Sequence, residues 1–286
     1  MIPCKTTTPR LPKKIRLTEP FSSVAEIRIR VGRPAVCVNI FGDMSVCSEP
    51  FTAGETEEFF AEICRYSVHS FQEDIARGFV TLDGGHRVGI CGTAVTENGR
   101  IAFIKDISGL NIRVAHQISG CSDEIFKRFF TSEKGGLCSL LIAGKPLSGK
   151  TTILRDLARS LGERRRVTII DSRNEISASV RGMPSLDVGL NTDVLCGCGK
   201  SEGIMLALRS LSPEVIICDE IAHDEDAVEQ ALFCGVKIIA AAHAASLKEL
   251  DSRFGVSENK GLPRLFDANV VIGERGKIIE ERGVVL

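Results

Sequence analysis

A short polar loop in the middle of the chain has the residue types and spacing that bind a phosphate. It fits the pattern G-x-x-x-x-G-K-[ST] without a mismatch and consists of Gly144, Lys145, Pro146, Leu147, Ser148, Gly149, Lys150 and Thr151. Glycines let backbone N–H groups turn inward around a phosphate, and a helix starting at Lys150 adds the positive end of its dipole. We expect Lys150 to reach the β- and γ-phosphates and the Thr151 hydroxyl to ligate Mg²⁺, with Thr152 completing the nucleotide-binding set.

The flanking residues decide between a phosphate site and a chance match in a glycine-containing turn. The apolar run "LLIA" precedes the loop, and the helix-forming run "TTILRDLARSL" follows it. A buried strand that leads through such a loop into a helix is the context that the motif requires. The sequence therefore predicts a nucleotide site at this point.

A second apolar segment, "EVIIC", ends in two acids, Asp219 and Glu220. We predict that Asp219 holds the Mg²⁺ ion and that Glu220 orients and deprotonates the attacking water. The alternative is that the two acids open a helix N-terminus, where acidic side chains are favoured in any case. The phosphate loop upstream favours the catalytic interpretation.

Two more polar positions follow apolar segments. Asp171 and Glu175, in "IIDSRNEIS", come after a predicted strand, so they can face the crevice beyond the carboxyl ends of the strands. A surface loop explains this spacing equally well. His243 ends another apolar strand, and it either senses the γ-phosphate or is a hydrogen-bonded core histidine.

The elements that must position these residues alternate between strand and helix. Apolar segments such as "LCSLLIAG", "RVTIID" and "VKIIAAAH" are separated by helical ones such as "KTTILRDLARSLG", and a terminal hairpin is predicted with its turn at 274–276. Buried strands alternating with helices indicate a mainly parallel sheet covered on both faces. The predicted fold class is therefore α/β over residues 137–286.

The first part of the chain has a different pattern. Alternating apolar and charged residues predict a strand over 26–30, and the run "AVCVNIF" predicts a second strand over 35–41. A helical spacing covers 52–78, and a β-meander follows with turns at 83–85 and 97–99. These features indicate a smaller α+β domain over residues 1–118. A linker helix over 119–136, ending at Gly135-Gly136, is expected to join it to the α/β domain.

Composition narrows the class of protein. The chain has 286 residues, 43% of them apolar, and a net charge of −1. A near-neutral chain with no Trp and one Tyr is a poor candidate for binding nucleic acid through phosphate contacts and base stacking. The 11 cysteines, without an apolar secretory segment at the start, favour free thiols in a reducing cytoplasm. No apolar run reaches the roughly 18 residues of a membrane span.

Several longer segments resemble the stage III sporulation protein AA family. They include "GKPLSGKTT", "DSRNEI", "LRSLSPEVIICDEI" and "GVKIIAAAHAAS", with "EIRIRVGRP" and "RGFVTLDGGHRVGICGTAV" in the first half, so the resemblance covers roughly residue 26 to the end. That family is similar to the hexameric ATPases of type II and type IV secretion. The resemblance implies a RecA-like ATPase domain that uses ATP and Mg²⁺ and assembles into a homo-oligomeric ring, with six subunits expected. It also implies a motor on the mother-cell cytoplasmic face, docked on membrane proteins of a channel into the forespore.

The resemblance further implies roles by position. Glu175 lies in the Asp box of the secretion ATPases and His243 in their His box. Arg113, in "LNIRVA", and Arg209, in "LRSLSPE", are candidates to touch nucleotide phosphates, within the chain or across a subunit boundary. An arginine there stabilises charge that develops on the γ-phosphate.

Departures from the family pattern leave some roles open. The Asp box usually reads D-E-R-S-E, whereas Ser172 and Asn174 stand at its second and fourth positions, so either Asp171 or Glu175 is the working acid. Ala222 replaces a glycine after the acidic strand. Two other functions remain alternatives: a RecA-like ATPase stimulated by nucleic acid, and a non-hydrolysing switch in which ATP drives ring assembly.

Overall fold

The computed structural model describes residues 4–5, 8–76, 78–97, 99–130, 136–222, 224–254 and 261–283. Asn98 of the second predicted turn and Gly135 of the predicted linker end lie outside these ranges. The chain divides into two compact units, Cys4–Gln117 and Ile118–Leu286, each with its own core. Within the described ranges, every helix is too short or too polar to span a bilayer.

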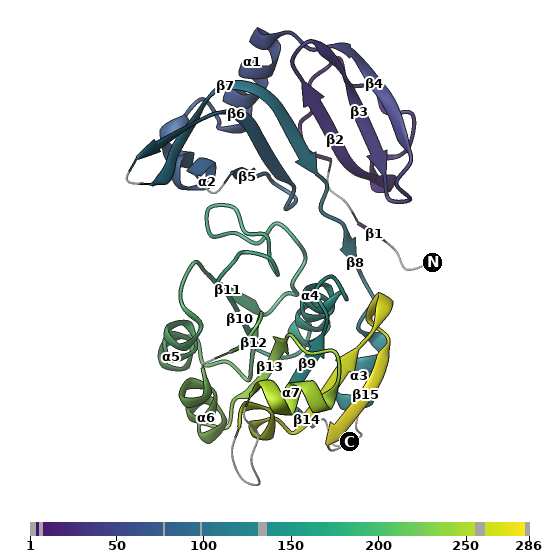
Figure 1. Ribbon diagram of the computed structural model, residues 1–286. Helices are drawn as coiled ribbons and strands as arrows, with labels where there is room; N and C mark the ends of the chain where they lie inside the picture. The colour runs from purple at the N-terminus through teal and green to yellow at the C-terminus, as the bar shows by residue number, and fades with distance from the viewer. Residues whose placement is uncertain are drawn as a thin grey trace. The chain divides into compact units, whose positions relative to one another are not determined.

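The N-terminal unit is built on a six-stranded antiparallel sheet with the order β4-β3-β2-β7-β6-β5 (Figure 1). Its strands are β2 (Val24–Arg30), β3 (Arg33–Asn39), β4 (Met44–Pro50), β5 (Phe79–Thr81), β6 (Arg87–Glu97) and β7 (Arg100–Arg113). Its helical segments are η1 (Phe21–Ser23), α1 (Ala53–Ile63), η2 (Val68–Phe71) and α2 (Gln72–Ala76). Two short strands, β1 (Cys4–Lys5) and β8 (Gln117–Ile118), form a separate pair. The predicted strands and meander are confirmed.

The long helix predicted over 52–78 is wrong, because the chain breaks it after α1. Arg65 and Tyr66 adopt positive φ angles of 49° and 59°, which reverse the backbone before η2 begins. The run "CRYSVHS" has poor intrinsic helix propensity. Phe59, Phe60 and Ile63 lie on one face of α1, and all three side chains are buried in the unit's core.

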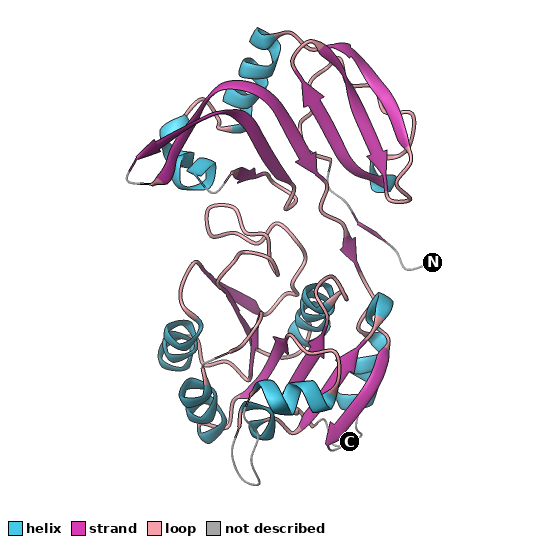
Figure 2. Ribbon diagram, in the orientation of Figure 1, coloured by secondary structure: helices cyan, strands magenta, loops and turns pink. Residues whose placement is uncertain are grey.

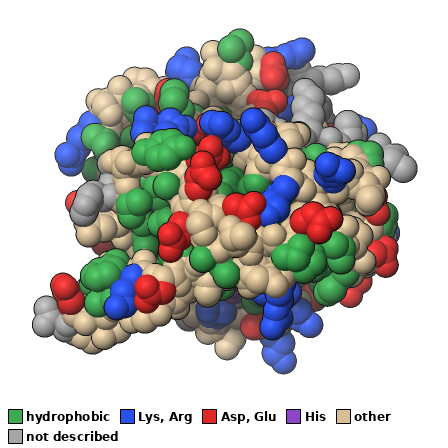
Figure 3. Space-filling model, turned by 90° about the horizontal axis from the view of Figure 1, so that it is seen from above, with side chains coloured by type: hydrophobic (Ala, Val, Ile, Leu, Met, Phe, Trp, Pro, Cys, Tyr) green, Lys and Arg blue, Asp and Glu red, His purple; other side chains and the backbone are tan. Residues whose placement is uncertain are grey.

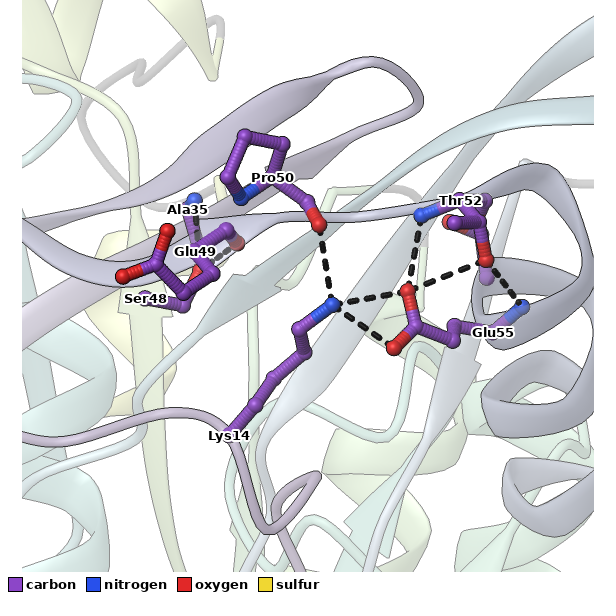
Figure 4. Close-up of polar contacts among 8 residues, drawn as sticks. Lys14, Ala35, Ser48, Glu49, Pro50, Thr52 and Glu55 are labelled. Atoms are coloured by element: carbon purple, nitrogen blue, oxygen red, sulfur yellow. Dashed lines mark hydrogen bonds and ion pairs between the residues drawn. The ribbon is translucent and has the colours of Figure 1, made fainter.

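A lysine anchors the N-terminal segment of this unit to the start of α1 (Figure 4). Lys14 Nζ lies 2.7 Å from Glu55 Oε1 and 2.9 Å from the carbonyl oxygen of Pro50. Glu55 also closes a capping box with Thr52, and the hydrogen bond from Lys14 is the main reason that its pKa is lowered to about 2. Glu55 thus provides hydrogen-bond acceptors both for the N-terminus of α1 and for the Lys14 ammonium.

The C-terminal unit contains a seven-stranded sheet with the order β11-β10-β12-β13-β9-β14-β15. Its strands are β9 (Leu140–Gly144), β10 (Val167–Asp171), β11 (Thr192–Cys196), β12 (Val215–Cys218), β13 (Lys237–Ala242), β14 (Ala268–Ile272) and β15 (Ile278–Gly283). Its helical segments are α3 (Asp123–Phe130), α4 (Lys150–Gly162), α5 (Lys200–Ser210), α6 (Glu225–Phe233), α7 (Leu247–Arg253), η3 (Leu262–Leu265) and η4 (Glu274–Gly276). Only β15 is antiparallel among these described strands, and it closes the predicted hairpin with β14.

Helices cover both faces of this sheet, as predicted from its apolar strands (Figure 2). Successive residues of β9 point to opposite sides: Leu140 and Ile142 pack with α3 and α4, while Leu141 packs with α5 and α6. The segment expected as a linker helix is α3, and its Phe129 is buried in the core of this unit. Because both faces are covered, only the edges and the strand ends remain for chemistry.

Candidate functional site

The polar loop joins β9 to α4 through a backbone path that its sequence requires. Gly149 has a φ angle of 98° and starts α4 from the left-handed region, where glycine carries no steric penalty. A Cβ at Gly144 would lie 2.5 Å from Ser148 Oγ, so a larger residue there would push the loop apart. Leu147, also left-handed at 64°, projects fully into solvent. The loop is therefore a tight cradle with one exposed apolar tip.

Unsatisfied polar groups in this cradle fit a phosphate. Ser148 Oγ is buried without a hydrogen-bond partner among the described residues. The first N–H groups of α4 have no acceptor within the helix, and they carry the positive end of its dipole. An anion with several oxygen acceptors satisfies such donors together, so the residues present fit a nucleotide phosphate.

Lys150 is held in this cradle by acceptors of the loop. Its Nζ donates to the carbonyl oxygens of Gly144 and Lys145, both at 2.9 Å, and lies 3.2 Å from His243 Nδ1. The side chain is buried, and burial lowers the pKa of its ammonium, while the charges of Asp219 and Glu220 act in the opposite direction. The Lys150 ammonium thus lies in the loop at the point where phosphate oxygens would bind.

The ends of three parallel strands bring the acidic and histidine side chains to this loop. β10, β12 and β13 are neighbours in the sheet and end next to Asp171, Asp219 and His243 respectively. A pocket of about 370 Å³ lies at these ends. It is lined by Pro146, Leu147, Gly149, Lys150, Thr151, Thr152, Arg173, Glu175, Asp219, Glu220 and His243. The structure therefore brings together most of the residues that the sequence singled out.

His243 connects the loop lysine to Glu220. Its Nε2 lies 3.1 Å from Glu220 Oε1, while its Nδ1 faces Lys150. An ammonium has only donors, so Nδ1 acts as the acceptor, and the proton on Nε2 is donated to Glu220. The imidazole is about 29% exposed and belongs to the pocket wall. Of the two interpretations open from the sequence, the core histidine is not what this geometry shows.

Asp171 and Glu175 occupy different environments, which the sequence alone left unresolved. The Asp171 carboxylate is fully buried and accepts hydrogen bonds from the backbone N–H groups of Glu175 and Ser177, each at 2.8 Å, and from Ser177 Oγ at 2.7 Å. A weaker bond from Ile176 N, at 3.3 Å, completes the set. Glu175 instead lines the pocket. Asp171 therefore shapes the loop, and Glu175 is the acid of this box that lines the pocket.

Two further arginines belong to the site, and only Arg173, at the third position of the Asp box, lies in a sequence motif. Arg155, on the second turn of α4, donates to the carbonyl oxygens of Glu175 and Ile176 and so fastens the Asp171 loop to the helix. Arg173 Nη1 lies 2.8 Å from Glu220 Oε2. Both contacts join residues 20 or more positions apart, so local spacing gives no indication of them.

The two arginines singled out from the family pattern lie away from this pocket or in the other unit. Arg209 is exposed at the end of α5. This helix of 11 residues is about 16 Å long and runs from the carboxyl ends of the strands back toward their amino ends. It is not among the described residues that line the pocket. Arg113 is exposed at the end of β7 in the N-terminal unit. Contacts of either side chain with phosphate stay predictions.

Comparisons with known sequences give a consistent result. A profile of the family described as sporulation stage III, protein AA, matches residues 10–285. Stage III sporulation protein AA of Bacillus subtilis is 38% identical over 238 residues, which cover 80% of this chain and 76% of that protein. Protein SEEDLING PLASTID DEVELOPMENT 1 of Arabidopsis thaliana is 28% identical over 257 residues, covering 85% of this chain and 33% of that protein.

Solved structures show the same fold at low sequence identity. The ATPase DotB of Legionella pneumophila superposes with a TM-score of 0.52 at 17% identity, covering 87% of this chain and 72% of that one. The pilus retraction motor PilT with bound ADP gives a TM-score of 0.53 at 13% identity, covering 87% and 74%. The fold is therefore that of the RecA-like secretion ATPases, preceded by a smaller unit with an antiparallel sheet.

Proposed function

The chain belongs to the sporulation stage III, protein AA family, and from this premise we propose that it is the ATP-hydrolysing motor of a secretion-type channel complex in endospore formation. Hydrolysis is Mg²⁺-dependent in this proposal and takes place at the pocket beside the 144–151 loop. The observation that carries the proposal is the convergence of Lys150, Thr151, Asp219 and Glu220 on that pocket.

In this proposal the 144–151 loop binds the nucleotide, and side chains at the ends of the strands carry out the hydrolysis. The loop amides and Lys150 hold the β- and γ-phosphates, and Thr151 and Asp219 hold the metal. Mg²⁺, when bound, neutralises charge on the phosphate oxygens. Glu220 orients a water molecule and accepts its proton, with Glu175, which lines the same pocket, as a second acidic group. His243 positions Glu220 relative to Lys150 through its two ring nitrogens.

Assembly and location follow from the family in this proposal. The protein forms a homo-oligomeric ring, with six subunits expected, in which Arg113 or Arg209 of one subunit reaches the nucleotide of the next. The ring docks on membrane proteins of the channel complex on the mother-cell side. Rings of this kind complete their sites between subunits, so hydrolysis depends on assembly.

Charge distribution favours this motor over an ATPase driven by nucleic acid. On the face shown in Figure 3, Lys and Arg side chains lie interspersed with Asp and Glu side chains. The net charge of −1 agrees with this mixture. Binding dominated by nucleic-acid phosphates requires a concentrated positive surface.

The experiment is steady-state ATP hydrolysis by the purified chain over a range of protein concentrations, with and without DNA. Glu220→Gln is measured beside it, because the amide keeps the shape of the side chain and cannot take the proton. We expect a rate per subunit that rises with concentration and falls on the order of 10²–10⁴-fold in Glu220→Gln. Lys150→Ala should abolish nucleotide binding, and Glu220→Gln should retain it.

Three other results point elsewhere. Hydrolysis by Glu220→Gln at the wild-type rate removes Glu220 as the base. Stimulation by DNA favours the nucleic-acid ATPase. Nucleotide binding without hydrolysis at any concentration favours the assembly switch, and adding the membrane partners then separates a switch from a motor that needs its docking site.

A further inference from the structure

Arg173 is a charged residue of the pocket that the proposed hydrolysis scheme does not use. It stands in the loop after β10 and lines the same pocket as Lys150 and Thr151. Its side chain is 63% exposed, and its ion pair with Glu220 is 2.8 Å long. A guanidinium at this place has a planar fork of donors that matches the oxygens of a phosphate.

The pair with Arg173 completes the coordination of Glu220. Oε2 of Glu220 faces Arg173, and Oε1 faces His243 at 3.1 Å. Both oxygens of the proposed base are therefore occupied by protein groups when no nucleotide is present. A base in this arrangement is held by its neighbours and is not aimed at a water molecule.

The backbone under Arg173 is fixed, while its side chain can turn. Asn174 N donates to the Asp171 carbonyl oxygen at 3.1 Å, and the Asp171 carboxylate holds the following amides. Arg155 fastens the same loop to α4. A change of partner by Arg173 thus needs side-chain rotation only, without a movement of the loop.

A phosphate group is the stronger partner for this arginine. Ion pairs in which one member is largely exposed are weak, because water competes for both charges. A phosphate carries more charge than one carboxylate and accepts two parallel hydrogen bonds from a guanidinium. A nucleotide bound at the loop would bring its γ-phosphate to the pocket that Arg173 lines together with Lys150 and Thr151.

We propose that Arg173 exchanges partners during the cycle: it holds Glu220 while the site is free of ATP and moves to the γ-phosphate when ATP binds, which releases Glu220 to orient water. This inference rests on the proposed function, since it needs ATP at the 144–151 loop. ADP lacks the γ-phosphate and leaves the pair with Glu220 in place. The exchange couples the readiness of the base to the presence of the phosphate to be cleaved.

The first test is nucleotide affinity of the full chain, measured by calorimetry with ATPγS and with ADP in the presence of Mg²⁺. Arg173→Ala should weaken ATPγS binding roughly ten-fold or more and change ADP binding less than about two-fold. Arg173→Lys should fall between, because it keeps the charge without the fork. The matched control is Arg164→Ala, an exposed arginine in the turn after α4, which should change neither affinity.

The second test follows the ¹⁵Nε signal of Arg173, assigned by its loss in Arg173→Lys. In nucleotide-free protein, Glu220→Gln should shift this signal, and with ATPγS bound the same substitution should leave it unchanged. If Glu220→Gln does not shift the Arg173 signal in nucleotide-free protein, the proposed exchange is overturned.

The affinity result separates the two proposals. Equal weakening of ATPγS and ADP by Arg173→Ala, or no effect on either, overturns the inference and leaves the proposed function standing. Wild-type protein that binds neither nucleotide overturns both. Arg173→Gln replaces Arg173→Ala if the alanine variant does not fold.

Discussion

Asp171 and Asp219 end two neighbouring parallel strands, and their environments differ sharply. Ile170 and Cys218, the residues before them, are partners in the register between β10 and β12. Both carboxylates are buried. Asp171 accepts four hydrogen bonds from its own loop, whereas for Asp219 one hydrogen bond to its carboxylate is described, from Glu220 N at 2.9 Å.

This difference indicates a structural role for Asp171 and a ligand-binding role for Asp219. Burial raises the pKa of Asp219, with a further contribution from the charge of Asp171, against the opposing effects of the Glu220 amide and Lys200. A buried carboxylate that its own protein leaves under-coordinated is costly to the fold and suited to a cation. The Asp171 carboxylate already accepts hydrogen bonds from three backbone N–H groups and one hydroxyl of its own loop, so its acceptor sites are occupied.

The largest expected effect is on stability, from Asp171→Ala. The substitution leaves the amides of Glu175, Ile176 and Ser177 buried without their acceptor, so we expect a loss of about 3–5 kcal/mol in the free energy of unfolding. Urea unfolding of the full chain measures it. Asp193→Ala, an exposed aspartate on β11, is the control and should stay within about 0.5 kcal/mol of wild type. Equal effects of the two substitutions would remove the structural role of Asp171.

Asp219→Asn should act in the opposite direction on stability and strongly on activity. Loss of the metal-binding charge is expected to lower ATP hydrolysis on the order of 10²-fold. The same change removes a buried charge that the fold opposes, so the nucleotide-free protein should gain about 0.5–2 kcal/mol. Hydrolysis rates and urea unfolding without nucleotide test the two parts. A destabilised Asp219→Asn protein would contradict the contrast with Asp171.

The gain in stability should depend on pH with a definite sign. Because the pKa of Asp219 is raised in the fold, the folded state binds the proton more tightly than the unfolded state. Its contribution is fully present below the ordinary pKa of 3.8 and is lost as pH rises through the folded value. The stability difference between Asp219→Asn and wild type should therefore be larger at pH 7 than near pH 4. Unfolding curves at both pH values, recorded without Mg²⁺, measure it, and a difference that shrinks toward pH 7 would reverse the sign.

The sequence predicts the strand ends of this site well, because the signals are local. The glycine spacing of the 144–151 loop and the acids after β12 are each contained in one short segment, and the parallel sheet follows from fully apolar strands. Which acid of the 171–175 box faces a ligand is not local. It depends on the path of the loop over α4, which Arg155 fixes from 20 positions away.

The sequence pattern also gives no sign of the break after α1, for a related reason. The apolar spacing of the 52–78 segment continues past the residues that turn the chain, so periodicity alone joined α1 to α2 across Arg65 and Tyr66. The pair of Arg173 with Glu220 joins residues 47 positions apart and is visible only once the strand order is known.

Arg155→Ala tests how much the hydrogen bonds from α4 stabilise the loop after β10. It removes two donors to the carbonyl oxygens of Glu175 and Ile176 and leaves the Asp171 carboxylate in place. We expect a loss of about 1–3 kcal/mol, smaller than for Asp171→Ala, together with a higher KM for ATP, because Glu175 and Arg173 are then less firmly held. Arg159→Ala, from the next turn of α4, serves as the matched control, since its partner Asp156 bonds to Ser122 and not to the loop after β10. An unchanged KM with reduced stability would confine Arg155 to a structural role.

The smallest expected effect is that of Ser177→Ala, and it tests whether the coordination of Asp171 is graded. The hydroxyl is one of four donors to Asp171, and its loss leaves three backbone donors in place, so we expect a destabilisation of about 1 kcal/mol. In the Asp171→Ala background the same substitution should cost less, because its acceptor has already gone, and urea unfolding of the four proteins gives the coupling directly. Additive effects would mean that Ser177 stabilises the loop through Ser179 Oγ, 2.8 Å away, and not through Asp171. Coupling of the expected sign would show that the Asp171 carboxylate is bound to its own loop. Of the two buried carboxylates, Asp219 would then be the one whose oxygens can still accept a metal.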